Sequence, residues 1–345
     1  MANMIHIEKT SLIPNWQQEL QSAFTDIDTL LRFLKLDTQE LAEHYRAASD
    51  FPLLVTRSYA ERIKKADWND PLLLQVLPCL DELETHEGYL SDPVGDAQAS
   101  KSPGIIHKYH GRILVITTGA CAIHCRYCFR REFPYSDNSA NRSQIANIQQ
   151  YLAENPDVTE VILSGGDPLM LSDSKFQYLF ESLSNNKQIQ RIRIHTRLPI
   201  VLPNRITKHL LATLKSSRKK VVVVIHANHS NELNDEVESA LLALKNIGVT
   251  LLNQTVVLKN INNNTPTLTS LSTRLFECHT LPYYLHVLDK VNGAAHFDTD
   301  IQHVHSIYAE MQKQLPGYLV PKLVREEQGK SHKSMLQTNY WGINI

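Results

Sequence analysis

The sequence has no apolar run that approaches the ~20 residues needed for a membrane-spanning helix. Residues 1–10 carry charges and contain no apolar stretch long enough for a signal peptide. An excess of one charge is also missing, because 35 Lys and Arg balance 36 Asp and Glu, and no long basic patch stands out. We therefore expect a cytoplasmic protein that has no general affinity for membranes or nucleic acid.

Cysteine is scarce as well, with five residues in a chain of 345, yet three of the five lie within residues 121–128. Thiols packed so closely are poor disulfide partners for one another and are better suited to bind metal in a reducing compartment. Cys79 and Cys278 stand alone. Free cysteine is usually a small core residue, so we expect both to be plain buried thiols.

Disorder is not indicated, because 42% of the residues are hydrophobic and 21% are charged, as in ordinary globular proteins. The length suits one α/β barrel with an added helical segment. Residues 15–90 place apolar side chains near helical spacing, which predicts short helices. A segment rich in turn formers follows at 88–104 and is the predicted boundary. We expect an N-terminal helical extension and linker at 1–104, a barrel at 105–315 and a C-terminal segment at 316–345.

From residue 112 onward, short β-branched runs alternate with longer amphipathic stretches about every 30 residues, which is typical of successive βα units. We therefore predict an α/β fold, a partial (βα)6 TIM-like barrel of buried parallel strands. The predicted strands are 113–117, 161–164, 191–195, 221–226, 250–257 and 283–287, with a closing strand at 318–324. The predicted helices centre near residues 147, 178, 209, 240, 270 and 307. Active sites of such barrels lie at the carboxyl ends of the strands, where the motifs of this sequence also fall.

Cys121, Cys125 and Cys128 have the spacing C-x3-C-x2-C, so one loop can wrap a metal cluster. Four-iron clusters normally take four cysteines, and a triplet leaves one iron open to a substrate, which indicates catalysis. A structural zinc ion is the alternative, with His124 or a distant residue as the fourth ligand. That alternative describes a zinc-stabilised binding or regulatory protein without catalysis.

Residues 164–168, Ser-Gly-Gly-Asp-Pro, fall where the second predicted strand becomes a loop. Their glycines allow the backbone to approach a ligand that side chains would block, although a simple turn before a helix capped near Ser172 explains the same residues. His226 and His229 lie at the end of the fourth predicted strand. They could bind a second metal, but we expect hydrogen bonds, which histidines at such positions make more often.

The cysteine triplet, with the aromatic Tyr127 before its last member, resembles the signature of radical S-adenosylmethionine enzymes. Longer stretches are similar to lysine 2,3-aminomutase, namely 112–131, 193–206, 253–258 and 289–297. Within that family, 286–291 and 317–326 most resemble the branch that makes (R)-β-lysine for the modification of translation elongation factor P. The resemblance spans residues 93–333 and implies a partial barrel of the radical S-adenosylmethionine type.

The resemblance also implies an iron–sulfur cofactor. It implies that Cys121, Cys125 and Cys128 hold one 4Fe-4S cluster and that S-adenosyl-L-methionine occupies its open iron in exchangeable form. The residues implied to receive the amino group of S-adenosylmethionine are those of the Gly-Gly motif, Ser164, Gly165, Gly166 and Asp167.

A further implied cofactor, pyridoxal 5'-phosphate, is bound as an imine by a lysine amine, which a substrate amine can displace. Counting from the matched Val320 and Pro321 places this lysine at Lys333. Lys330 is the alternative, because the family has repeated glycines before its lysine whereas only one glycine precedes Lys330. Arg112 matches an arginine close to this cofactor, but a buried ion pair at a strand end fits the sequence equally.

A lysine substrate carries a carboxylate at one end and an ammonium at the other, so its site needs a guanidinium and carboxylates. The resemblance implies that Arg130 binds the carboxylate. It also implies that Asp289 and Glu326 bind the ε-ammonium, with Glu326 in place of the commoner aspartate. An aminomutase that acts on another amino acid, such as glutamate or arginine, stays open, although two acidic residues argue against glutamate.

The resemblance therefore implies an isomerase that converts free L-lysine into (R)-β-lysine. It also implies that a separate ligase attaches this product to elongation factor P and that an external electron donor reduces the cluster. No nucleic-acid or membrane partner is expected, and the sequence leaves open whether the chain forms a homo-oligomer.

Overall fold

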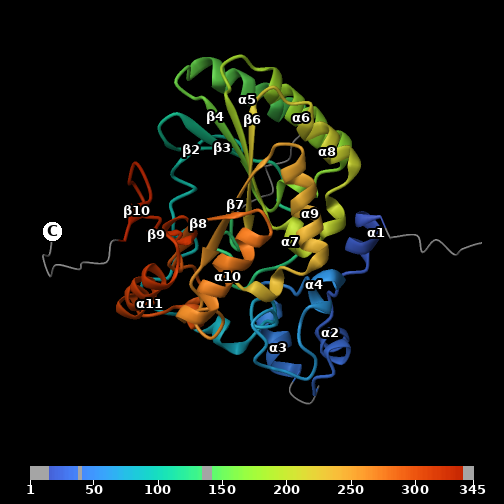
Figure 1. Cartoon of the computed structure of the whole chain (residues 1–345), viewed down its shortest axis with the longest axis vertical. Coiled ribbons are helices and arrows are strands. Elements are labelled where there is room, and N and C mark those ends of the chain that lie inside the picture. The colour runs from blue at the N-terminus through green and yellow to red at the C-terminus, as the bar shows by residue number, and fades with distance from the viewer. Residues whose placement is uncertain (1–14, 38–40, 134–141, 337–345) are drawn as a thin grey trace, which may run out of the picture.

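The computed structural model describes residues 15–37, 41–133 and 142–336, which form an α/β fold around one sheet (Figure 1). The strands lie in the sheet in chain order, from β1 to β10. Strands β3 to β8 are parallel and correspond to the six strands predicted from the sequence. The strands are β1 (Ser100–Ser102), β2 (Ile105–Tyr109), β3 (Arg112–Ile116), β4 (Glu160–Ser164), β5 (Arg191–Thr196), β6 (Lys220–His226), β7 (Thr250–Val256), β8 (Leu281–His286), β9 (Lys322–Arg325) and β10 (Ser334–Met335).

The sheet is a partial barrel, as expected. Within the described ranges, β1 and β10 form its two edges and do not pair with each other. The strand expected at 318–324 is the shorter β9, which pairs with β8 and β10 and closes nothing. It begins at Lys322 because Gly317–Leu319 form a 3-10 turn and Pro321 lacks the N–H that a ladder needs.

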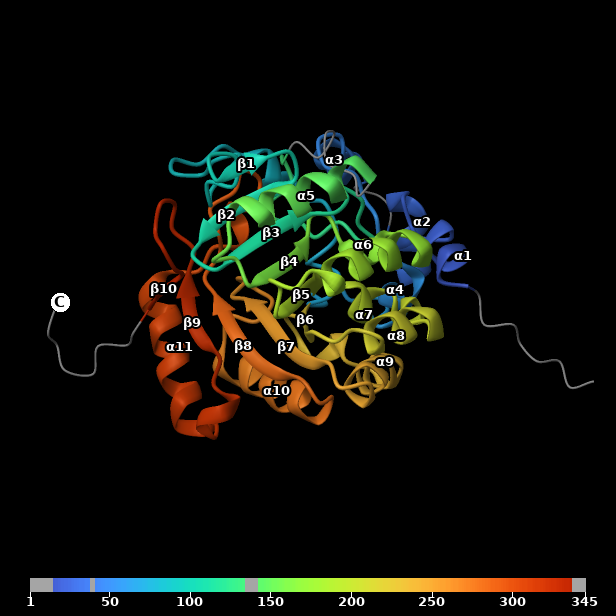
Figure 2. The ribbon, with the colours of Figure 1, turned by 90° about the horizontal axis from the view of Figure 1, so that it is seen from above.

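Helices follow the strands at the positions predicted from the sequence and cover the outer face of the sheet (Figure 2). They are α5 (Arg142–Glu154), α6 (Asp173–Asn185), α8 (Lys208–Lys215), α9 (Asp235–Asn246), α10 (Thr265–Glu277) and α11 (Ile301–Gln314). Polar side chains cap their first turns: Ser172 accepts from Lys175 N at the start of α6, and Asn234 accepts from Val237 N at the start of α9. The expected cap at Ser172 is confirmed.

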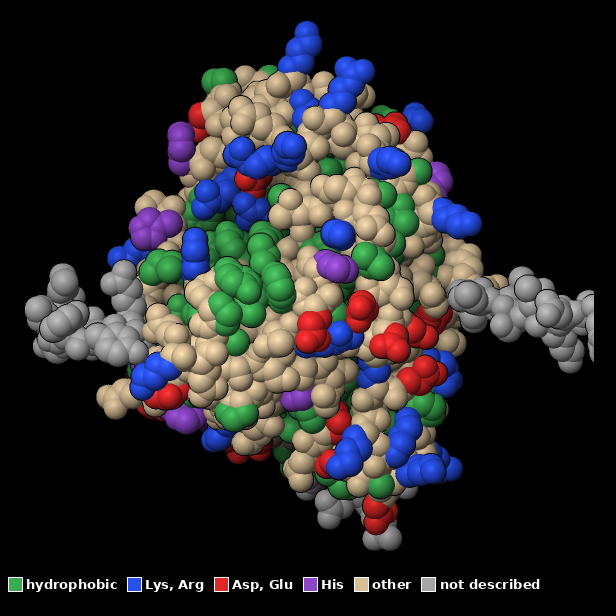
Figure 3. All heavy atoms as spheres, in the orientation of Figure 1, with side chains coloured by type: hydrophobic (Ala, Val, Ile, Leu, Met, Phe, Trp, Pro, Cys, Tyr) green, Lys and Arg blue, Asp and Glu red, His purple; other side chains and the backbone are tan. Residues whose placement is uncertain are grey.

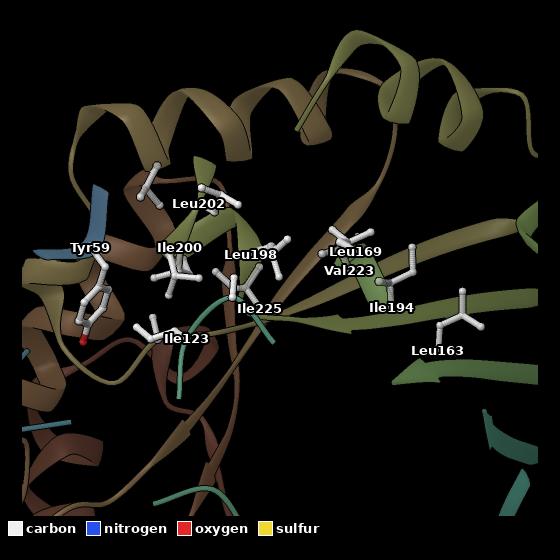
Figure 4. Packing of buried hydrophobic residues seen from close by; sticks show 14 of the residues in the cluster. Tyr59, Ile123, Leu163, Leu169, Ile194, Leu198, Ile200, Leu202, Val223 and Ile225 are labelled. Carbon is white, nitrogen blue, oxygen red and sulfur yellow. The ribbon is translucent and has the colours of Figure 1, made fainter. Parts of the chain in front are cut away.

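Short helices also form at the N-terminal end of the chain, where the sequence predicted them. These are α1 (Trp16–Gln21), α2 (Ile27–Leu34), α3 (Leu41–Ala48) and α4 (Arg57–Glu61), followed by the 3-10 turn η1 (Leu80–Leu83). One buried cluster joins Leu30 and Tyr59 of this segment to Ile123 and Ile200 of the barrel, and Figure 4 shows the last three close together. The extension therefore shares a core with the barrel, and the division at residue 104 stays a prediction.

Alternation along the strands separates this core from the inner face of the sheet. In β5, Ile194 is fully buried and pairs in register with Leu163 of β4 and Val223 of β6, in the packed layer of Figure 4. Its neighbours Arg193 and His195 point the other way and line a cavity. The period of two along β5 thus places apolar residues against the helices and polar residues inside the barrel.

Several elements were not expected, among them both strands of a hairpin and one short helix. The turn-forming segment before the barrel contains β1, which pairs with β2 as a hairpin because Gly104 adopts a positive φ of 76° in the turn between them. The short helix α7 (Leu198–Val201) follows β5, and it forms a single turn with Pro199 near its start. A single turn is too short to show helical periodicity in the sequence.

The surface carries acidic and basic side chains together, and hydrophobic side chains gather near the middle of the face in Figure 3. Large apolar side chains that are exposed include Phe276 and Tyr318, whose rings lie 5.4 Å apart. In the parts of the chain that the structure describes, no helix is long and apolar enough to cross a bilayer.

Candidate active site

A cavity of about 640 Å³ opens at the carboxyl ends of the parallel strands, as expected for a barrel of this kind. The last residues of β4 to β8 line it, namely Ser164, Thr196, His226, Val256 and His286. The alternative Lys330 does not line it, whereas the preferred site residues do: Cys121, Cys125, Cys128, Arg112, Arg130, Ser164, Gly165, Gly166, Asp167, Asp289, Glu326 and Lys333. The structure thus brings the whole predicted set together in one cavity whose size suits a cofactor and a small substrate.

The cysteine loop after β3 docks on the N-terminal extension. The backbone N–H of His124 donates to Leu54 O at 2.9 Å. The His124 ring stacks on Phe51 with centroids 4.8 Å apart, and its Nδ1 lies 2.8 Å from Pro52 O. The histidine considered as a fourth zinc ligand therefore fixes the loop to the extension.

A buried ion pair holds the same loop from a second side. The Arg126 guanidinium donates to both oxygens of Glu82, at 2.7 and 2.5 Å, and Arg131 adds a bond of 3.0 Å. Both guanidinium groups also lie over the Phe51 ring, at 4.7 and 4.8 Å from its centre. Residues of the extension thus position two of the three arginines that surround the last cysteine of the triplet.

The thiols of the triplet are suited to an iron–sulfur cluster. Burial raises the pKa of Cys128 to about 11 and also raises the pKa of Cys121, with a smaller contribution from the neighbouring cysteines. A bound metal must therefore displace protons from these sulfurs, and it compensates the charge that burial disfavours. Three soft sulfur donors around one cavity fit the ligand set of a cluster with an open iron.

The Gly-Gly motif packs against the cysteine loop. A Cβ added to Gly165 would lie 2.5 Å from Thr118 O, and one added to Gly166 would lie 2.3 Å from Ala120 O. Hydrogen bonds of 2.7 and 2.9 Å join Gly166 N to Thr118 O and Asp167 N to Ala120 O. The glycines are therefore needed because two backbone segments approach closely, a reason that differs from the approach to a ligand considered above.

Asp167 uses its carboxylate within the protein. Its oxygens accept from the Thr196 hydroxyl at 2.8 and 2.9 Å and from Arg197 N at 2.7 Å. Burial raises the pKa of Asp167 to about 6, although these hydrogen bonds work against the shift. The Gly-Gly motif is thus tied both to the cysteine loop and to the end of β5.

A chain of charged groups connects the residues predicted to bind substrate with those predicted to bind cofactor. Asp96 accepts from Arg130 at 2.7 Å and pairs with Lys108 at 2.5 Å. Lys108 also lies 3.0 Å from Glu326, whose second oxygen pairs with Lys333. Arg130, Glu326 and Lys333 are therefore part of one network, whereas Lys330 is exposed and does not line the cavity.

Asp289 and Glu326, the two acidic residues predicted to bind the substrate ammonium, differ in charge state. Burial raises the pKa of Asp289 to about 7, and the negative charge of Glu326 adds to this shift. Burial also opposes ionisation of Glu326, but Lys333 and Lys108 outweigh it and lower its pKa to about 2. Near neutral pH, Glu326 is therefore ionised, whereas Asp289 is partly protonated.

Two histidines in the cavity were not predicted as site residues. In the described part of the chain, the buried Nε2 atoms of His195 and His286 have no hydrogen-bond partner. Burial lowers the pKa of both imidazoles, that of His286 to about 3, so both are neutral. Orphaned polar atoms that face a cavity fit a ligand that supplies their partner.

The isolated histidines and cysteines behave largely as expected. His226 Nε2 lies 2.9 Å from the Tyr127 hydroxyl, and His229 Nδ1 accepts from Asn231 N at 3.1 Å, so both make hydrogen bonds. Cys278 is fully buried in the core. Cys79 is only half-buried, with its sulfur 3.6 Å from His296 Nε2, so the expectation of a plain buried thiol is correct for one cysteine of the two.

Sequence reasoning missed Asp96 and Lys108, which precede the first predicted strand in a segment assigned to a linker and its border. It quoted Arg197 within a matched stretch without giving it a role. The available signal was weak, because single charged residues are usually exposed and nothing in their spacing showed that folding would bury them.

The partial barrel and its three-cysteine loop define a radical S-adenosylmethionine enzyme. Its cofactors are a 4Fe-4S cluster and S-adenosylmethionine. Residues 115–268 match the model of the Radical SAM superfamily. Proteins named L-lysine 2,3-aminomutase are similar over nearly the whole chain. The one from Escherichia coli is 43% identical over 97% of this chain and 98% of its own length.

Proteins of the same name from other bacteria are also similar. The one from Haemophilus influenzae is 42% identical over 93% of this chain and 95% of its own length. The one from Clostridium subterminale is 31% identical over 94% of this chain and 78% of its own length. The chain belongs to the lysine 2,3-aminomutase family and is an isomerase.

Proposed function

We propose that this protein converts free L-lysine into (R)-β-lysine with a 4Fe-4S cluster, S-adenosylmethionine and pyridoxal phosphate. The observation that carries the proposal is the shared cavity, which the cysteine triplet, Lys333, Arg130, Asp289 and Glu326 all line. When bound, the cluster and S-adenosylmethionine supply the radical that removes hydrogen from the substrate, and pyridoxal phosphate delocalises the unpaired electron.

In the proposed site, Cys121, Cys125 and Cys128 bind three irons of the cluster and leave the fourth to S-adenosylmethionine. The motif from Ser164 to Asp167 holds the cysteine loop in place and receives the amino group of S-adenosylmethionine. Gly166 packs closely against Ala120 O, next to Cys121, which supports a position of the motif beside the proposed cluster.

Lys333 is the proposed attachment point for pyridoxal phosphate, because its ammonium lies in the cavity beside Glu326 while Lys330 is exposed. Arg112, whose guanidinium lies 4.7 Å from the centre of the Tyr109 ring, is the proposed cationic partner of this cofactor. The unpaired Nε2 atoms of His195 and His286 offer further polar contacts to it.

Arg130 is proposed to bind the substrate carboxylate, and Asp289 and Glu326 to bind its ε-ammonium. An ammonium close to Glu326 already exists in the form of Lys108, which supports the affinity of this carboxylate for a primary amine.

We further propose that the product modifies translation elongation factor P through a separate ligase, that an external donor reduces the cluster and that the enzyme acts in the cytoplasm. The similarity of residues 286–291 and 317–326 to the elongation factor P branch of the family supports this use of the product.

The test is anaerobic incubation of the iron-reconstituted protein with L-lysine, S-adenosylmethionine, pyridoxal phosphate and a strong reductant, followed by chiral chromatography. (R)-β-lysine should appear and should require every component. L-glutamate and L-arginine are assayed in parallel, and conversion of either in preference to lysine would replace the proposed substrate. Free lysine is compared with lysine attached to elongation factor P, which separates the two forms of substrate.

A further inference from the structure

A buried guanidinium contacts one of the three cysteine sulfurs. Arg197 Nη1 lies 2.6 Å from Cys125 Sγ, while Nη2 donates to Glu232 Oε2 at 2.9 Å and to Gln75 Oε1 at 2.8 Å. Only 8% of the Arg197 side chain and none of the Glu232 side chain is exposed. Cys128, by contrast, has a hydrogen bond with the backbone of Arg130 and none with a guanidinium among the contacts of the described residues.

The position of this guanidinium is fixed from both ends. At its backbone, Arg197 N donates to Asp167 at 2.7 Å, directly after the end of β5. At its far end, Glu232 is itself held by the N–H groups of Asn228, at 2.8 Å, and His229, at 3.1 Å. A charge that has so many fixed partners cannot turn away from the sulfur, and a guanidinium does not lose its proton in proteins.

We propose that Arg197 sets the reduction potential of the cluster by donating a charged hydrogen bond to the sulfur of Cys125. One electron from an external reductant adds one negative charge to the cluster. A cation and hydrogen bond at a ligand sulfur stabilise the reduced form more than the oxidised form, and hydrogen bonds to sulfur are known to tune such potentials. Burial strengthens the effect because the local dielectric constant is low.

Glu232 moderates this effect. Its carboxylate neutralises part of the guanidinium charge, so the field at Cys125 is the difference between a near cation and a more distant anion. Removal of Arg197 and removal of the Glu232 charge should therefore shift the potential in opposite directions. General loosening of the structure does not predict opposite signs.

The inference rests on the proposed role of Cys125 as a cluster ligand, and the test separates the two. Arg197→Gln, Glu232→Gln and the matched control Arg205→Gln are reconstituted with iron and sulfide, and iron content is measured. Arg205 is fully buried and pairs with Asp173 at 2.7 Å, but it makes no bond to a cysteine among the described residues. Potentials are then measured by redox titration followed by electron paramagnetic resonance, without lysine, pyridoxal phosphate or S-adenosylmethionine.

In Arg197→Gln, the equilibrium constant for reduction should fall about tenfold, which is a potential about 59 mV lower for one electron. Glu232→Gln should raise the potential, and Arg205→Gln should leave it unchanged. Unchanged potentials in the first two variants, with full iron content, would overturn the inference. If Arg197→Gln does not hold iron, Glu232→Gln decides, since a potential that stays level or falls contradicts the argument. Wild-type protein that takes up no iron would instead contradict the proposed cluster itself.

Discussion

Glu326 holds Lys333 in an ion pair inside the cavity. The residue proposed to bind the substrate ammonium is therefore paired with the residue proposed to bind the cofactor. Lys108 pairs with the other carboxylate oxygen at 3.0 Å. Use of the Lys333 amine to attach the cofactor would remove one of these two cations from Glu326. A buried carboxylate that loses a partner is costly, so a substrate ammonium becomes the favourable replacement.

Glu326→Gln should therefore weaken lysine binding. A hydrogen bond between charged groups contributes about 1.5–3 kcal/mol, which corresponds to a loss in kcat/KM of about 10- to 150-fold. Steady-state kinetics at several lysine concentrations measure the change, with Glu327→Gln as the control because Glu327 is exposed and does not line the cavity. Equal kinetics in the two variants would exclude Glu326 from substrate binding.

Lysine turnover should depend on pH through Asp289, whose pKa is raised to about 7. An ammonium binds the ionised carboxylate, so kcat/KM for lysine should rise as the pH rises, by about tenfold per unit below pH 7, and then level off. Glu326, with a pKa of about 2, stays ionised throughout. Asp289→Asn should lower kcat/KM and remove the titration near pH 7, whereas an unchanged profile would assign it to another group.

The sequence predicted most of the fold because the local signals agree with the tertiary structure. The runs around Val161, Ile192 and Val223 are β-branched and short, and caps such as Ser172 mark where the next helix begins. The hairpin of β1 and β2 was missed because its turn residues are equally typical of a linker. The 3-10 turn at Gly317–Leu319 was missed because it is too short to have a period.

The candidate site was predicted as a set, but its internal connections were not. Arg130 and Glu326 could be named from matched stretches, whereas the bridge between them needs Asp96 and Lys108, and Lys108 lies on β2, an antiparallel strand paired with β3. The same holds for Arg197 and Cys125, which are 72 residues apart in the chain. Ion pairs between distant segments leave no periodic trace in one sequence.

Attachment of pyridoxal phosphate should distinguish the two candidate lysines. Lys333→Ala should lose the visible imine absorbance and the covalent adduct that forms on borohydride reduction, because its amine is the one in the cavity. Lys330→Ala should keep both, since its side chain is exposed. Peptide mass spectrometry of the reduced protein locates the adduct, and an adduct at Lys330 would contradict the assignment.

Gly166→Ala should displace the cysteine loop, because the new Cβ would lie 2.3 Å from the backbone oxygen of Ala120. Backbone atoms cannot yield as a flexible side chain can, so we expect loss of at least half of the bound iron after reconstitution. Gly317→Ala is the control, since a Cβ there meets nothing within 4 Å. Full iron content in both variants would show that the loop tolerates the shift.

The buried pair of Arg126 and Glu82 should stabilise the protein far more than a pair at the surface. Glu82→Gln leaves a buried guanidinium without its carboxylate, so the free energy of unfolding should fall by about 3–5 kcal/mol. Glu238→Gln breaks a pair of similar length with Arg274, 2.7 Å, but its carboxylate is 38% exposed and the loss should stay below about 1 kcal/mol. Urea unfolding under anaerobic conditions compares the two variants.

Because Arg126 lies between Cys125 and Cys128, the larger loss of stability in Glu82→Gln should be accompanied by weaker iron binding. Equal losses in the two variants would mean that the extension does not hold the loop.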